Sequence, residues 1–161
     1  MRKMLLGLLV LACFAALTLS GLAQQSSSQV ADDVMAMVRA QWAAEIKDPT
    51  NIAAQMKNIA DDYTEFNGDY ATRLESKAMN MRLAEAGGSS SVKTVAGEMA
   101  NPKVQVYNGD VAILSYNYVG LIKDKDGKTE PSRAKSTRVY VKQNGKWMLV
   151  HANFGADPLP K

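Results

Sequence analysis

The chain has 161 residues, a formal charge of +3 and 22% charged residues, which suits one globular domain with an ordinary core. Its single cysteine is Cys13, in an apolar N-terminal run, and its single histidine is His151. One cysteine and one histidine are too few for a zinc or transition-metal cluster, so we expect no metal. The sequence also lacks the glycine motifs that hold nucleotides or a nucleophilic serine, and we expect no cofactor.

Residues 1–23 have the pattern of a signal peptide. Arg2 and Lys3 precede an apolar run over residues 4–19, and the small residues within 21–23 suit a signal peptidase. The apolar run is too short for a convincing membrane span, although a retained N-terminal anchor is the alternative. We therefore predict an exported protein, periplasmic or secreted, that begins near Gln24 and does not associate with a membrane after cleavage.

Cleavage would also change the charge balance of the chain. Loss of Arg2 and Lys3 reduces the 19 basic residues to 17, against 16 acidic ones. A nearly neutral chain has no general attraction to phosphate backbones, so we expect no nucleic-acid partner. Cys13 would leave as well, so no disulfide is expected.

Helical spacing dominates the first half of the remaining chain. Residues 24–29 are polar and are predicted to form a tether, and residues 30–158 are predicted to form a single domain. The first helix is predicted to begin at Val30 and to end at Asp48-Pro49, because aspartate and proline end one helix and begin the next. Its predicted apolar stripe consists of Met35, Val38, Trp42 and Ile46.

Two further helices are predicted before the strands begin. The second helix would bury Ile52, Met56 and Ile59, and the polar residues 61–66 would end it. The third helix is predicted over residues 70–86, followed by a pair of glycines that stop it.

From Val92 onward, apolar residues alternate with polar ones, which is typical of strands. Strands are predicted over residues 92–95, 103–107 and 111–122. Asn108-Gly109 between two of them predicts a two-residue hairpin turn, because this dipeptide readily adopts positive φ at both positions. That turn would pair Val106 with Val111.

The last hairpin is the clearest element in the sequence. Asn144-Gly145 predicts a second two-residue turn, which would pair Tyr140 with Leu149 and Arg138 with His151 on one face. A histidine this close to an arginine would tend to stay neutral. The opposite face is apolar and consists of Val139, Val141, Met148 and Val150.

Three helices followed by an antiparallel meander predict an α+β fold, with the helices on one face of a curved sheet. The last hairpin has apolar residues on both faces, and the helices can cover only one of them. The uncovered face would be a large apolar patch on a monomer, so we expect a homodimer or a larger homo-oligomer through the convex sheet.

The second half of the chain resembles the association domain of calcium/calmodulin-dependent protein kinase II and the SnoaL-like proteins, both of the nuclear transport factor 2-like superfamily. The resemblance implies a cone-shaped α+β barrel, in which a curved antiparallel sheet wraps on about three N-terminal helices and a pocket lies between them. It is looser over residues 30–88, where it depends on helix order, Trp42 and residues 62–66. The motifs that carry it are Asn101-Pro102, Gly109-Asp110, Ala112, Tyr116, Thr137-Arg138-Val139, Gly145-Lys146-Trp147 and Val150-His151.

The resemblance also implies which residues line the pocket. It places Arg138 on the concave side, whereas two other pocket arginines of the kinase domain fall at Tyr118 and near Phe154 here, so a three-arginine carboxylate clamp is not preserved. Asn153 replaces a second histidine on the terminal strand. The expected ligand is small, and either apolar or bearing a carboxylate or carbonyl group. The expected lining consists of Trp42, Tyr63, Tyr116, Tyr118, Arg138, Tyr140, Leu149, His151 and Asn153.

Two functions remain open from the sequence. The first is an exported, non-catalytic module for small-molecule binding or oligomerisation. The alternative is a small cofactor-independent enzyme of the ketosteroid isomerase, polyketide cyclase or dehydratase type, with Asp62, Tyr63 or His151 as acid–base groups. The first is preferred because the sequence positions no pair of titrating groups. A carboxylate in an enclosed cavity, within hydrogen-bond reach of a tyrosine or histidine, would favour the enzyme.

Overall fold

A computed structural model describes residues 25–68, 70–87 and 92–157. The predicted signal peptide and its cleavage site lie in residues 1–24, outside the described residues, as does the predicted domain end at residue 158. In the described ranges, no helix is long and apolar enough to cross a membrane.

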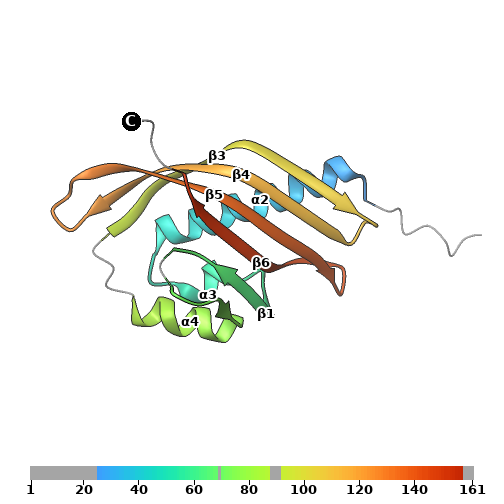
Figure 1. Ribbon diagram of the computed structural model, residues 1–161, viewed down its shortest axis with the longest axis horizontal. Helices are drawn as coiled ribbons and strands as arrows, with labels where there is room; N and C mark the ends of the chain where they lie inside the picture. Colours follow the sequence, from blue (N-terminus) through green and yellow to red (C-terminus); the bar gives the residue numbers. More distant parts are fainter. Residues whose placement is uncertain (1–24, 69, 88–91, 158–161) are drawn as a thin grey trace, which may run out of the picture.

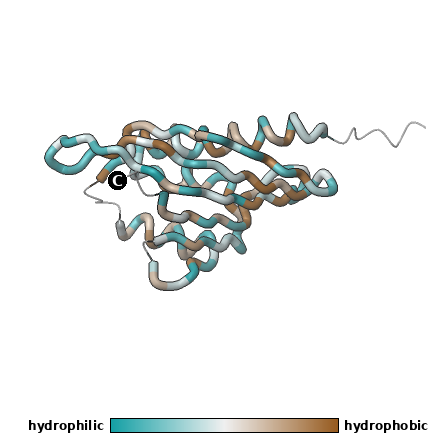
Figure 2. Tube along the Cα trace, turned by 45° about the horizontal axis from the view of Figure 1, so that its top comes forward, coloured by the Kyte–Doolittle hydropathy of each residue, from teal (hydrophilic) through white to brown (hydrophobic). Residues whose placement is uncertain are grey.

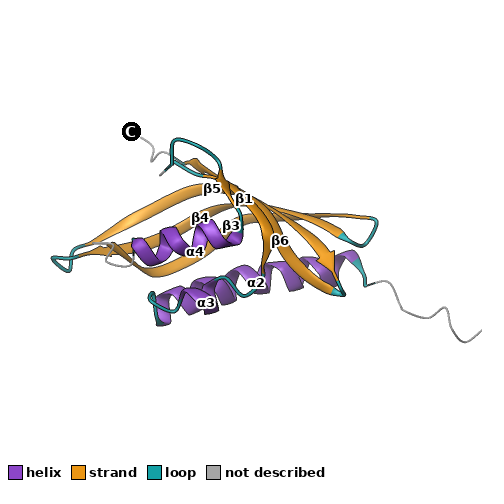
Figure 3. Ribbon diagram, turned by 90° about the horizontal axis from the view of Figure 1, so that it is seen from below, coloured by secondary structure: helices purple, strands orange, loops and turns teal. Residues whose placement is uncertain are grey.

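Six strands form one curved, unclosed sheet, and the helices lie on its concave face (Figures 1 and 3). The strand order is β2-β1-β6-β5-β4-β3. The strands are β1 (Ile59–Phe66), β2 (Leu74–Glu75), β3 (Val92–Tyr107), β4 (Val111–Asp124), β5 (Thr129–Gln143) and β6 (Lys146–Ala156). The helices are α2 (Ser27–Lys47), α3 (Ile52–Gln55) and α4 (Lys77–Ala86). This arrangement confirms the predicted α+β class with helices on a curved sheet.

The long helix α2 supplies one side of the core. Ser26 caps its first turn by accepting a hydrogen bond from the Gln29 amide, so residues 27–29 are helical and do not form the predicted tether. The buried stripe consists of Val30, Val34, Val38 and Trp42. Ile46, predicted to continue this stripe, is 40% exposed, because the stripe turns away from the sheet at the end of the helix.

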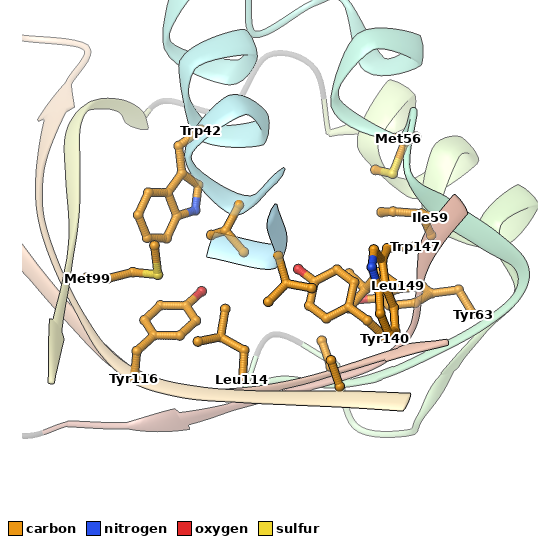
Figure 4. Close-up of a cluster of buried hydrophobic side chains, with 14 of the residues drawn as sticks. Trp42, Met56, Ile59, Tyr63, Met99, Leu114, Tyr116, Tyr140, Trp147 and Leu149 are labelled. Carbon is orange, nitrogen blue, oxygen red and sulfur yellow. The ribbon is translucent and has the colours of Figure 1, made fainter. Parts of the chain in front are cut away.

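The sheet supplies the other side of the core. Tyr116 and Tyr140 extend from β4 and β5 toward α2, with Leu114 beside them (Figure 4). Strands β3 to β5 form an antiparallel ribbon whose far loop, between β4 and β5, is hydrophilic (Figure 2). The apolar side chains therefore concentrate under α2, away from that loop.

The predictions for the second and third helices are partly wrong. The second helix ends after four residues, and Ile59 instead begins β1, which pairs in parallel with β6. The third helix begins only at Lys77, because Leu74 belongs to β2 and is buried against the core. Strand β1 depends on β6, which is distant in sequence, and β2 in turn depends on β1, so local spacing could not identify either strand.

The two predicted hairpin turns differ in outcome. Asn144 and Gly145 have φ of 50° and 78°, and Gln143 pairs with Lys146, which confirms the two-residue turn. Asn108-Gly109 also turns with positive φ, but Val106 pairs with Ala112 and not with Val111. The extra residue is Asp110, whose carbonyl accepts a hydrogen bond of 2.8 Å from the Lys142 amide.

A β-bulge at Val150 alters the register of the last hairpin. Tyr140 faces Leu149 as predicted, but Val139 faces His151 and Arg138 faces Ala152. One extra residue on β6 exchanges the faces of every side chain beyond it. The predicted pairing of Arg138 with His151 is therefore wrong.

Candidate functional site

Arg138 lies on the concave face of β5 and is only 4% exposed. Its Nε donates a hydrogen bond of 3.0 Å to the Tyr116 hydroxyl, and its Nη1 donates one of 2.7 Å to Oε1 of Gln41 on α2. The guanidinium carbon also lies 5.3 Å from the centre of the Phe154 ring. Residues from β4, β6 and α2 therefore hold this side chain in place.

The hydrogen-bond partners of this buried cation, Tyr116 and Gln41, are neutral. Among the described residues, no aspartate or glutamate forms an ion pair with Arg138. Burial lowers the pKa of the guanidinium, but the phenols of Tyr116, Tyr140 and Tyr63 raise it, and the pKa lies above its ordinary value. Arg138 therefore stays charged, and a buried charge without a counter-ion favours binding of an anion.

A cavity of about 590 Å³ opens beside Arg138 on the concave face. Four aromatic side chains line it, namely Trp42, Tyr116, Tyr118 and Phe154. The Trp42 ring lies edge-on to Tyr116 and Tyr118, with centroid distances of 5.8 Å and 5.3 Å. The charged lining residues are Glu45, Glu65, Arg133 and Arg138, so the cavity combines aromatic walls with charges of both signs.

Glu65 lines the cavity, although it was not among the predicted lining residues. Its Oε2 accepts a hydrogen bond of 2.5 Å from the Tyr63 hydroxyl, and Asn67 donates to its other oxygen. Burial and the charge of Glu65 raise the pKa of Tyr63 well above its ordinary range. Tyr63 and Glu65 are two residues apart, which in a strand places both side chains on one face. The polar residues 61–66 instead predicted the end of a helix, so the strand was missed.

Glu65 and Arg138 occupy one row across the sheet. Glu65 pairs with Ala152 on β6, and Ala152 pairs with Arg138 on β5. Two strand spacings separate their backbones by about 10 Å. The small side chain of Ala152, which is fully buried, lies between them.

Gln41 contributes to a second cavity. Of the two, the cavity beside Arg138 is the larger. The smaller cavity has a volume of about 270 Å³, and its lining includes Gln41, Tyr140 and Leu149. Gln41 thus links it to the larger cavity through the hydrogen bond to Arg138. Helical spacing alone could not identify Gln41, because it lies beside the apolar stripe and not in it.

The predicted site residues therefore fall into three groups. Trp42, Tyr116, Tyr118 and Arg138 line the larger cavity, whereas Tyr140 and Leu149 line the smaller one. Tyr63 is buried and reaches the larger cavity through Glu65. Like Tyr63, the residues Asp62, His151 and Asn153 line neither cavity.

His151 has a different environment from the predicted one. Its Nδ1 lies 2.8 Å from the Thr64 hydroxyl on β1, and its ring lies edge-on to Phe66. The bulge at Val150 removes it from the row of Arg138. Across the described ranges, no group of three His, Cys, Asp or Glu side chains could hold a metal ion.

Comparison with known proteins identifies the family. Residues 70–158 match the model of the calcium/calmodulin dependent protein kinase II association domain. This match covers more than half of the chain, and the chain therefore belongs to that family. Over 60 residues it is 28% identical to a calcium/calmodulin-dependent protein kinase type II of Caenorhabditis briggsae, which covers 37% of this chain. The same match covers only 11% of the kinase.

Solved structures agree with this assignment at the level of the fold. A putative association domain of the same kinase type from Xanthomonas campestris has a TM-score of 0.68 at 22% identity, covering 86% of this chain and 94% of that one. A nuclear transport factor 2-like protein from Salmonella enterica has a TM-score of 0.69 at 13% identity, covering 84% and 96%. The fold that the resemblance implies is thereby confirmed.

Proposed function

We propose that this chain is an exported, non-catalytic module that self-associates and binds a small acidic or carbonyl-bearing molecule in the larger cavity. The observation that carries the ligand proposal is the buried Arg138, whose hydrogen-bond partners Tyr116 and Gln41 are neutral. A guanidinium has five N–H donors, so a ligand oxygen can share them. A carboxylate would compete well with the Gln41 carbonyl, because it brings a negative charge and can accept two parallel N–H donors of the guanidinium.

Binding of hexanoate, compared with uncharged hexanol, tests this proposal. Titration calorimetry should show hexanoate binding that Arg138→Gln weakens by about 1–3 kcal/mol, the value of a charged hydrogen bond. Arg133→Gln is the matched control, because Arg133 lines the same cavity but lies 3.9 Å from an Asp157 oxygen. Equal losses in the two folded variants, or equal affinities for hexanoate and hexanol, would contradict the role of Arg138.

Self-association is supported by the family and by the convex face of the sheet. The helices occupy the concave face (Figure 3), and the convex face presents Val111, Ile113, Val139, Val141 and Met148 from three adjacent strands. Light scattering at micromolar concentration should give a dimer or a larger assembly. Val141→Lys should reduce the assembly size, whereas Gln143→Lys at the exposed strand end should not. A monomeric wild-type chain would contradict this part of the proposal.

Export is supported by the pattern of residues 1–23. Mass spectrometry of secreted or periplasmic material should show that the mature chain begins at or near Gln24. An intact N-terminus in a soluble cytoplasmic fraction would contradict export.

A second candidate function is a small acid–base enzyme, and the contact between Glu65 and Tyr63 favours it. Glu65 lines the larger cavity and accepts a 2.5 Å hydrogen bond from a phenol, as a positioned base requires. In deuterated water, proton NMR would follow exchange of the C3 hydrogens of 2-oxobutanoate. The enzyme hypothesis expects catalysed exchange that Glu65→Gln abolishes, and exchange no faster than in buffer would reject it.

A further inference from the structure

The larger cavity is lined by two opposite charges, Arg138 on β5 and Glu45 on α2. Gln41, which contacts Arg138, and Glu45 are four residues apart on α2. Residues at this spacing lie on one helix face, with their Cβ atoms about 6 Å apart. Glu45 and Arg138 both line the cavity, so a cationic and an anionic group face one space.

In the other two charged lining residues, Glu65 and Arg133, the charged group is already occupied by hydrogen bonds on both oxygens or by a nearby opposite charge. Glu65 accepts hydrogen bonds from Tyr63 and Asn67, and Arg133 lies near Asp157. Glu45 is half-buried, and its Oε1 accepts a hydrogen bond of 2.8 Å from the Thr94 hydroxyl. Glu45, Glu65 and Arg138 therefore all have neutral hydrogen-bond partners, but those of Glu65 occupy both of its carboxylate oxygens, whereas the Thr94 hydroxyl contacts only Oε1 of Glu45.

Aromatic rings lie beside the Glu45 carboxylate. Trp42 lies three residues before Glu45 on α2. The centre of the Tyr118 ring lies 5.3 Å from the centre of the Trp42 ring. Trp42, Glu45 and Tyr118 line the same cavity, and burial and the charge of Glu45 raise the pKa of the Tyr118 phenol. Aromatic faces next to a carboxylate attract an ammonium group, because the ring quadrupole and the negative charge act together.

We propose that the preferred ligand is a zwitterion, with a carboxylate bound at Arg138 and an ammonium group bound at Glu45 beside Trp42 and Tyr118. This inference rests on the proposed ligand function of the cavity and specifies the ligand class. One helical turn along α2 separates Gln41, the partner of Arg138, from Glu45, so we expect the two ligand charges to be about 6 Å apart. An ω-amino acid with a short aliphatic chain has this separation, whereas an α-amino acid carries both charges on adjacent atoms.

Three probes and two charge-matched variants test the inference by titration calorimetry at neutral pH. The probes are 5-aminopentanoate, its isomer 2-aminopentanoate, and hexanoate, which has a methyl group in place of the distant ammonium. We expect 5-aminopentanoate to bind about tenfold more tightly than either of the others, as one additional charged contact would give. Glu45→Gln should remove this preference, and hexanoate should still bind. Glu98→Gln, which removes the same charge from an exposed position on β3, should preserve it.

The outcomes separate the inference from the proposed function. If hexanoate binds as tightly as 5-aminopentanoate, or if Glu45→Gln leaves the preference intact, the zwitterion inference is overturned while the Arg138 anion site stands. If none of the three probes binds the folded wild-type chain, the proposed ligand function fails and the inference fails with it. Circular dichroism of each variant would verify that it is folded.

Discussion

Gly97 and Gly120 face each other across β3 and β4, and the Tyr118 ring lies over this pair. A Cβ atom on Gly120 would lie 2.2 Å from the Tyr118 hydroxyl and 2.7 Å from the Ala96 carbonyl oxygen. A Cβ on Gly97 would lie 2.9 Å from the same ring. The absence of two side chains thus creates the flat surface on which one aromatic wall of the cavity rests.

Gly120→Ala should therefore displace Tyr118 and destabilise the fold by about 1–3 kcal/mol, as overpacking usually does. Urea denaturation would measure this loss, and Trp42 fluorescence should change, because its ring contacts Tyr118. Gly155→Ala is the control, since a Cβ there would meet no atom within 4 Å. Similar stability of the two variants would show that Tyr118 does not depend on the glycine pair.

The buried phenols predict a loss of stability in alkaline solution. Burial raises the pKa of Tyr63 and of Tyr140, and the Glu65 charge adds to the effect at Tyr63. Below about pH 10 the phenols are protonated in both folded and unfolded chains, so their full contribution is present. Above that pH the unfolded phenols ionise first, and the free energy of unfolding falls by up to about 1.4 kcal/mol per pH unit for each such group.

Urea denaturation between about pH 8 and pH 11 would measure this decline. Tyr63→Phe should reduce its slope, because one protected phenol is absent. A decline of equal slope in wild type and Tyr63→Phe would show that Tyr63 ionises normally in the folded chain.

Gln41→Met should have opposite effects on stability and on ligand binding. The substitution removes the acceptor that Arg138 contacts at 2.7 Å, and the loss of a hydrogen bond to a charged group costs about 1.5–3 kcal/mol. Hexanoate should bind more tightly, since its carboxylate no longer competes with the amide carbonyl. Gln29→Met, on an exposed part of α2, should change neither quantity. Weaker hexanoate binding in Gln41→Met would mean that Gln41 assists the ligand.

Thr64→Val should affect stability but not the cavity. It removes the hydroxyl that lies 2.8 Å from His151 Nδ1, at a cost of about 1 kcal/mol for a typical hydrogen bond. Because the bulge places His151 outside the row of Arg138, hexanoate affinity should stay unchanged. A clear loss of affinity in this variant would place His151 in functional contact with the site.

Local chemistry determined much of this architecture from the sequence alone. Asn144-Gly145 sets its own turn, because the positive φ values depend on these two residues and not on distant partners. The alternation in β4 likewise indicates that Tyr116 and Tyr118 share a face. The end of α2 before Pro49 follows from the missing amide donor of proline.

Only the tertiary structure decided which groups meet in the cavity. The parallel pairing of β1 with β6 places Thr64 opposite His151 and Glu65 opposite Ala152, and the bulge at Val150 aligns that row with Arg138. Gln41 reaches Arg138 across 97 residues of sequence because α2 packs on the concave sheet. Side-chain period and turn type are local properties, whereas a bulge and a helix docking position minimise the energy of the whole sheet, so spacing along the chain could not reveal them.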